Sequence, residues 1–291
     1  MKHLFEEYKR SLKLLEIEEL LDVAFYRPLA FAFVKSIYTT SITPNQITCI
    51  AVVCGIVGGS MLSVDTYQAG IVAAILLPLS IVFDCADGML ARLKKNGTPF
   101  GRALDGVSDY IVGVTIYISI AIGYAGHEHA TALMALTVAA AISNSLHAVL
   151  VDYYRLRFVE YSRPQEEDGT AMTAPDAAKR TIPSGILEQF LAILDAKYAK
   201  AQRMITKRRT DTQLVRGEEY YRKNKTILRY WTYLGTSTQL TSLVVCAFIH
   251  RIDVYLYGVI IVGNLYAIAL SIIQSRIDAQ LHFHSHIEIA L

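Results

Sequence analysis

Six long stretches of the chain contain no Asp, Glu, Lys or Arg, and they restrict the possible fold more than any other feature. They cover residues 43–64, 66–83, 110–126, 130–151, 232–249 and 254–275. A helix needs about 20 residues to cross the ~30 Å hydrocarbon layer of a bilayer, and each run is near that length. Core helices of soluble proteins are usually shorter and carry a polar stripe. The sequence therefore predicts an all-α integral membrane protein with six transmembrane helices.

Composition agrees with a membrane protein. Hydrophobic residues make up 53% of the chain and charged residues only 19%, against about 25% charged in a typical soluble domain. The formal net charge of +2 is too small to indicate a nucleic-acid ligand. Five glutamates among the first thirty residues are unlike a signal or transit peptide.

Lys and Arg predict the orientation. The loops around Asp65 and Glu128 carry none, and the loop after the fifth run carries only Arg251. The loop between the second and third runs and the N-terminal segment are rich in them, and Arg276 follows the last run. The positive-inside rule therefore places both termini and the 92–101 loop in the cytoplasm.

The chain divides into four predicted parts. Residues 1–40 read as an amphipathic helix on the cytoplasmic surface, followed by an apolar segment broken at Pro28. Residues 41–154 hold the first four spans, and residues 232–291 hold the last two with a C-terminal tail. Residues 155–231 form a charged cytoplasmic insertion, with helices expected near 184–206 and 211–230; it could bind anionic lipid headgroups or act as a solvated linker.

Four aspartates lie where the second span ends and the third begins. Asp84 and Asp87 are spaced i, i+3, and Asp105 and Asp109 are spaced i, i+4, so each pair lies on one helix face. Four carboxylates cannot remain ionised together without a counter-charge. Mg²⁺ or Mn²⁺ prefers such oxygen ligands, and two metal ions could hold a pyrophosphate for displacement. The pattern predicts a two-metal site at the membrane edge.

The whole string, D-x-x-D-G-x-x-A-R-x8-G-x-x-x-D-x-x-x-D, resembles the signature of the CDP-alcohol phosphotransferase (CDP-alcohol phosphatidyltransferase) family. Its eight fixed positions are Asp84, Asp87, Gly88, Ala91, Arg92, Gly101, Asp105 and Asp109. The six-span count and the string Thr43-Pro44-Asn45-Gln46-Ile47-Thr48 are also similar to that family. The resemblance covers residues 37–154 well, and the later spans by topology only.

The resemblance implies a reaction in which a CDP-linked donor loses CMP and its phosphoryl group passes to an alcohol, one substrate being a lipid. All four aspartates would bind metal, and Asp109 would also be the catalytic base. The CDP and pyrophosphate site would be formed by Gly88, Ala91, Arg92 and Gly101. The resemblance further implies a homodimer.

The acceptor site is harder to place. Basic residues near the cytoplasmic span ends, Arg155, Lys225, Arg229 and Arg276, are candidates for holding an acceptor phosphate, although the positive-inside rule alone also predicts them. In the fourth span, Asn144 and His147 share a face. They either line a polar cavity or join helices by hydrogen bonds.

Two versions of the function stay open: transfer of a phosphatidyl group from CDP-diacylglycerol to a small polar acceptor, which we favour, or transfer from CDP-choline or CDP-ethanolamine to diacylglycerol. A membrane prenyltransferase also uses Asp pairs and Mg²⁺, but it lacks the Asp-Gly-x-x-Ala-Arg run. A divalent-cation transporter should carry its carboxylates near mid-span rather than at span ends.

Overall fold

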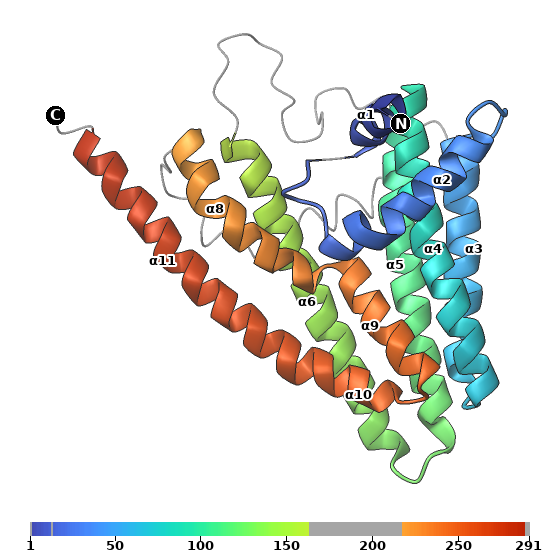
Figure 1. The fold of residues 1–291 in the computed structure, drawn as a ribbon. Helices are drawn as coiled ribbons and strands as arrows, with labels where there is room; N and C mark the ends of the chain where they lie inside the picture. Colours follow the sequence, from blue (N-terminus) through green and yellow to red (C-terminus); the bar gives the residue numbers. More distant parts are fainter. Residues whose placement is uncertain (1, 13, 163–216, 289–291) are drawn as a thin grey trace.

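The computed structural model describes residues 2–12, 14–162 and 217–288. Within these ranges the protein is all-helical and contains no strand, as the sequence predicts (Figure 1). The predicted helix at 184–206 lies outside the described residues. The helix expected at 211–230 is present in its described part as α8 (Glu218–Trp231).

Five helical segments are long and apolar enough to cross a membrane. The first two are Pro44–Ser63, which is α3 (Pro44–Ser60) with a short 3₁₀ turn, and α4 (Tyr67–Lys94). The third is Leu104–Gly126, which is most of α5 (Pro99–Gly123) followed by a 3₁₀ turn. The last two are α6 (Ala130–Ser162) and Ile252–Leu281, which runs from α10 into α11. The last span joins α10 (Ile252–Tyr257) through a π-helical turn (Gly258–Gly263) to α11 (Asn264–Glu288). The fold is thus that of an integral membrane protein.

The predicted count of six spans is not confirmed. The uncharged run 232–249 forms a 3₁₀ turn (Thr232–Leu234) and then α9 (Thr236–Phe248), which has 13 residues. A helix of that length is about 20 Å long, less than the ~30 Å of hydrocarbon. Glycine at position 235 separates α9 from α8, and α8 is strongly charged. Residues 232–249 carry no charge, as the prediction requires, but they do not form one continuous helix.

The turns after α3, α5 and α9 lie together at one end of the molecule, opposite both termini (Figure 1). Side chains join them: His127 Nε2 lies 3.0 Å from Asp65 Oδ2, and His250 Nε2 lies 3.3 Å from Asp65 Oδ1. The three loops that the sequence assigns to one side of the membrane therefore share one end of the structure. The side that this end faces stays a prediction.

The N-terminal part was predicted as an amphipathic helix followed by an apolar segment broken at Pro28. It contains α1 (Lys2–Ser11), a π-helical turn (Asp22–Tyr26) and α2 (Arg27–Ile37). Pro28 does not break the helix, because it lies in the first turn of α2, directly after the π turn. Proline has no N–H to donate, but a residue in the first turn of a helix needs none. In the π turn before it, the hydrogen bonds span five residues instead of four, and the Arg27 N–H donates to the Asp22 carbonyl oxygen.

The packing of α3, α4 and α5 positions the aspartate motif. A Cβ at Gly55 would lie 2.5 Å from Val112 Cγ2 on α5, and one at Gly58 would lie 2.9 Å from Leu76 Cβ on α4. Only glycine permits such close approach, as is common where membrane helices pack through small residues. Next to this crossing the helices share a hydrophobic core, which includes Leu62, Ala73, Leu77, Ile116 and Ile120. The cytoplasmic ends predicted for α4 and α5 are thereby held face to face.

Candidate active site

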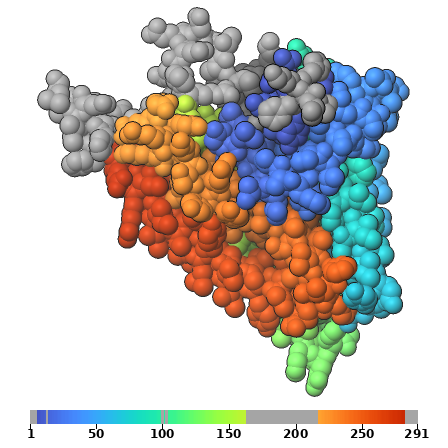
Figure 2. Space-filling view, in the orientation of Figure 1, coloured from blue at the N-terminus to red at the C-terminus, as the bar shows by residue number. Residues whose placement is uncertain are grey.

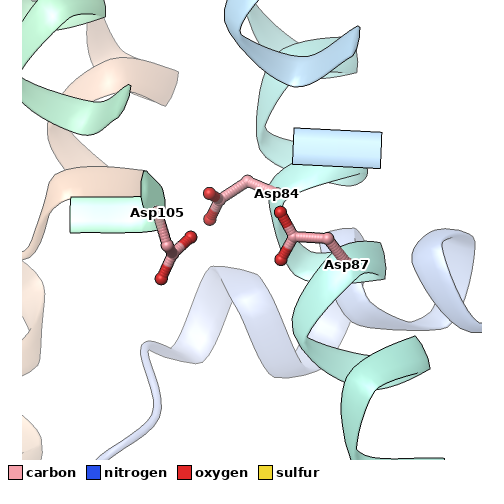
Figure 3. Close-up of side chains that lie close together, drawn as sticks. All are labelled: Asp84, Asp87 and Asp105. Atoms are coloured by element: carbon pink, nitrogen blue, oxygen red, sulfur yellow. The ribbon is translucent and has the colours of Figure 1, made fainter. Parts of the chain in front are cut away.

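Three of the four predicted metal ligands converge. Asp84 and Asp87 on α4 and Asp105 on α5 each offer a carboxylate oxygen, and these atoms all lie within 4.8 Å of one another. Figure 3 shows Asp84 and Asp87 leaving one helix toward Asp105 on its neighbour. Among the described residues this is the one group of three or more His, Cys, Asp or Glu side chains so arranged. We call these three residues the aspartate cluster.

A tight helical hairpin makes this convergence possible. α4 ends where Lys95 takes a left-handed conformation, with φ of 52°. α5 begins at Pro99, and its N-cap is Thr98, whose hydroxyl oxygen accepts a hydrogen bond from the Gly101 N–H at 2.9 Å. Only residues 95–98 therefore connect the two helices, so aspartates about two to three turns from the helix ends can lie opposite each other.

Asp87 is held by a residue from a third helix. The Thr48 hydroxyl donates a hydrogen bond to Asp87 Oδ2 at 2.5 Å, and both side chains are buried. Thr48 lies one turn into α3, which begins with a capping box between Thr43 and Gln46. The 43–48 string resembles the family, but its pattern alone assigns no role to Thr48. That string was the available signal for a contact that only the tertiary fold reveals.

Asp109 lies outside the aspartate cluster. It sits one turn further along α5 than Asp105, and its side chain is exposed. Asp109 is therefore not one of the three residues whose carboxylate oxygens all lie within 4.8 Å of one another, and its role as a fourth metal ligand stays a prediction. A place beside the cluster and open to solvent suits a group that meets an incoming substrate, so the role of Asp109 as a base stays a prediction.

The remaining motif residues surround the same end of the hairpin. An Arg92 guanidinium nitrogen, Nη1, lies 3.3 Å from where a Cβ would stand on Gly88, so a larger side chain there would press on the arginine. A Cβ on Gly101 would lie 2.9 Å from Asn45 Oδ1 at the start of α3. Ala91 approaches Gly97 in the connecting loop. Arg92 Nε also donates to the backbone oxygen of Ser11, a contact that the sequence did not predict.

The four predicted acceptor residues have different surroundings in the described structure. Arg155 pairs with Glu19, and Lys225 Nζ lies 5.5 Å from the ring centroid of Tyr221. Arg229 is exposed on α8. Arg276 lines a groove of about 830 Å³ between α6 and α11, and none of the motif residues lines that groove. An acceptor pocket made by these residues stays a prediction.

The ligand set suits a hard divalent cation. All three groups of the aspartate cluster are carboxylates, which Mg²⁺ and Mn²⁺ prefer over nitrogen or sulfur ligands. They belong to two facing helices, and the hydrogen bond from Thr48 orients one of them. Such a second partner commonly fixes a metal ligand in place. The residues present therefore fit the predicted cofactor.

Comparisons with known proteins agree with the motif. The sequence model for the CDP-alcohol phosphatidyltransferase family matches residues 41–179, which include the aspartate cluster. A phosphatidylinositol phosphate synthase from Corynebacterium glutamicum is 36% identical to this chain over 87 residues. The aligned part is 30% of this chain and 38% of that relative, so the similarity spans well under half of either protein.

Proposed function

Because the model of the CDP-alcohol phosphatidyltransferase family matches residues 41–179, we propose that the chain belongs to this family and is a membrane transferase of phospholipid synthesis. It moves the phosphoryl-linked group of a CDP-alcohol donor to an acceptor alcohol and releases CMP. The observation that carries this proposal is the aspartate cluster, since three carboxylates within 4.8 Å of one another repel unless a proton or a cation neutralises them.

Each motif residue has a role in the proposed chemistry. Asp84, Asp87 and Asp105 hold Mg²⁺ or Mn²⁺, which when bound neutralises the charge that develops on the pyrophosphate oxygens. Asp109 takes the proton from the acceptor hydroxyl as that oxygen attacks the donor phosphorus. The bond from phosphorus to the bridging oxygen then breaks, and CMP leaves.

Arg92 is the proposed partner of a donor phosphate, because a guanidinium forms strong, directed hydrogen bonds to phosphate oxygens. Gly88 leaves space beside it, and Gly101 keeps the start of α5 close to α3. These contacts support a nucleotide site on the loop side of the aspartate cluster.

We favour CDP-diacylglycerol as donor. The phosphatidylinositol phosphate synthase relative is named for a phosphatidyl product with a phosphorylated inositol headgroup. A phosphorylated polyol is therefore our first candidate acceptor, and the basic residues Arg155, Lys225, Arg229 and Arg276 remain candidates for its phosphate. Transfer from CDP-choline or CDP-ethanolamine to diacylglycerol is the alternative.

The arrangement in the membrane completes the proposal. The uncharged run 232–249 forms the sixth crossing, both termini and the aspartate cluster face the cytoplasm, and two copies form a homodimer. Residues 1–40, 41–154, 155–231 and 232–291 act as surface segment, catalytic spans, insertion and final spans. The charge pattern of the loops supports the orientation.

The test uses purified protein in vesicles with Mg²⁺ or Mn²⁺. Labelled CDP-diacylglycerol is offered with inositol phosphate, glycerol phosphate or serine, and labelled CDP-choline with diacylglycerol. We expect CMP release and a labelled phosphatidyl product in the first set. Product only in the second set would establish the alternative donor. No CMP from any pair, with a protein that still binds metal, would refute the transferase proposal and favour a prenyltransferase or a cation transporter.

A further inference from the structure

The N-terminal segment, residues 6–12 and 14–37, carries acidic side chains that are buried rather than solvated. Exposed fractions are 7% for Glu18, 3% for Glu19 and 9% for Asp22. Burying a carboxylate is costly unless it is paired and hydrogen-bonded. Figure 2 shows this segment packed against the surface of α8 and α9, far away along the chain. The contacts of Glu19 explain what its burial achieves.

Glu19 caps α9 from 219 positions away in the sequence. Its Oε2 accepts hydrogen bonds from the backbone N–H of Thr238 at 2.9 Å and from the Thr238 hydroxyl at 3.1 Å. Thr238 is the third residue of α9, and the N-cap residue, Gly235, provides no side-chain cap. A carboxylate at this position satisfies a free N–H and interacts favourably with the helix dipole. On its other side, Glu19 Oε1 lies 3.3 Å from Arg155 Nη2.

The carboxylate of Glu19 occupies the space that a side chain at position 235 would need. A Cβ on Gly235 would overlap with Oε1 and Cδ of Glu19. Even alanine at this position would therefore force the end of the glutamate side chain to move. Glu19 and Gly235 thus depend on each other, although 216 positions separate them in the sequence.

The same N-terminal segment reaches the motif. Ser11 is fully buried, and its backbone oxygen accepts a hydrogen bond from Arg92 Nε. The Ser11 hydroxyl donates to the Tyr8 carbonyl oxygen at 2.6 Å, and the Tyr8 ring packs edge-on against Phe31 at 5.2 Å. A buried ion pair, Glu18 with Arg27 at 2.6 Å, holds the linking residues to α2. The guanidinium of Arg92 is thus fixed on one side by the N-terminal segment.

We propose that Glu19 is a positioning residue: by joining the N-terminal segment to α9 and Arg155, it keeps the Ser11 carbonyl oxygen on Arg92 and so orients that guanidinium toward the donor phosphate. The proposal rests on the proposed function for the part played by Arg92. Its structural half, the docking of the N-terminal segment through Glu19, can be tested without any activity.

The first experiment measures docking. Amide hydrogen exchange of residues 8–31 is compared in the full-length wild type, Glu19→Ala, Gly235→Ala and the control Glu7→Ala. Glu7 belongs to the same segment but forms a partly exposed ion pair with Lys35. We expect faster exchange in the first two variants and little change in the control. Unchanged exchange in Glu19→Ala and Gly235→Ala would overturn the proposal, whatever the enzyme does.

The second experiment measures donor use. Glu19→Ala should lower kcat/KM for CDP-diacylglycerol about tenfold, mainly through KM, because an arginine that is no longer oriented binds the phosphate more weakly. The metal concentration that gives half-maximal rate should not change. Glu19→Gln, which keeps an oxygen acceptor for Thr238, should fall between Glu19→Ala and the wild type.

Coupling to Arg92 separates positioning from a general loss of stability. In an Arg92→Lys background the Nε donor is absent, so Glu19→Ala should cause little further loss of kcat/KM. An equal loss in both backgrounds would show that Glu19 acts elsewhere, and the proposal would fail. A wild type with no CMP release but normal docking would refute the proposed function alone. In that case the same four proteins, with and without Glu19→Ala and Arg92→Lys, are compared by their binding of CDP-diacylglycerol, measured as a thermal shift, instead of by turnover.

Discussion

At the scale of single residues, the contact between Thr48 and Asp87 has the clearest consequence. The hydroxyl orients one carboxylate of the aspartate cluster from a different helix. We predict that Thr48→Val weakens metal binding by about tenfold or more, as loss of a ligand's hydrogen-bonding partner commonly does. Titration of activity or thermal stability with Mn²⁺ measures it. Thr115→Val, on an exposed hydroxyl of α5, is the control and should leave the titration unchanged.

Asp87 and Asp109 should give different defects, since one lies in the aspartate cluster and the other outside it. We predict that Asp87→Ala abolishes both transfer and the rise in Tm with Mg²⁺ or Mn²⁺. Asp109→Asn should reduce transfer by about 10²–10⁴-fold, as expected for a base, while keeping that rise in Tm and donor binding. If Asp109→Asn also loses the metal-dependent rise, Asp109 is a metal ligand as the motif first indicated. Turnover above a tenth of wild type would exclude it as the base.

At the scale of helices, His147 joins three elements inside the membrane. Its Nε2 lies 2.9 Å from Asn264 Oδ1 on α11, and its Nδ1 lies 3.1 Å from Gln239 Nε2 on α9. Asn264 in turn donates to Ser143 on α6. These bonds confirm the helix-joining interpretation of His147, although its ring also lines the groove between α6 and α11.

We predict that His147→Leu destabilises the protein by about 1–3 kcal/mol, because two hydrogen bonds are lost. Asn264 Oδ1 then loses its partner, and Gln239 Nε2 keeps only its 3.4 Å bond to the Leu234 carbonyl oxygen. The measurement is Tm in detergent or lipid discs, where the change should be several degrees. Ser145→Ala, an exposed position on α6, is the matched control. A variant as stable as wild type would mean that lipid or water readily replaces the histidine.

At the scale of the whole molecule, the loops divide into two sets at opposite ends (Figure 1), and the orientation becomes testable. We predict that cysteines introduced at Asn96 and at Glu128, both exposed positions, in a background without native cysteines, label from opposite faces of sealed vesicles. In right-side-out vesicles, Asn96 should be protected and Glu128 accessible. The reverse pattern would place the aspartate cluster outside the cell, away from cytoplasmic CTP-derived donors.

Sequence and structure agree where local rules are sufficient. Asp84 and Asp87 share a face by helical spacing alone, and the short connection to α5 brings Asp105 opposite them. The other features of the fold and of the site depend on tertiary contacts, which cannot be read from the spacing of residues in the sequence. The run 232–249 has the composition of a span, yet Gly235 ends its helical continuity where Glu19 enters. Thr48 and Ser11 reach the motif from segments that lie outside the aspartate string, through contacts that their own sequence does not indicate.

The hairpin formed by α4, residues 95–98 and α5 also has a consequence for biogenesis. The three carboxylates of the aspartate cluster and the threonine that orients Asp87 all come from residues 48–105, a stretch of consecutive helices. Contacts between neighbouring helices form early, because little chain entropy is lost in closing short loops. The cluster can therefore assemble while the ribosome is still synthesising the later spans. The cap on α9 must wait until residue 238 has been made, and only then does the N-terminal segment gain its final anchor.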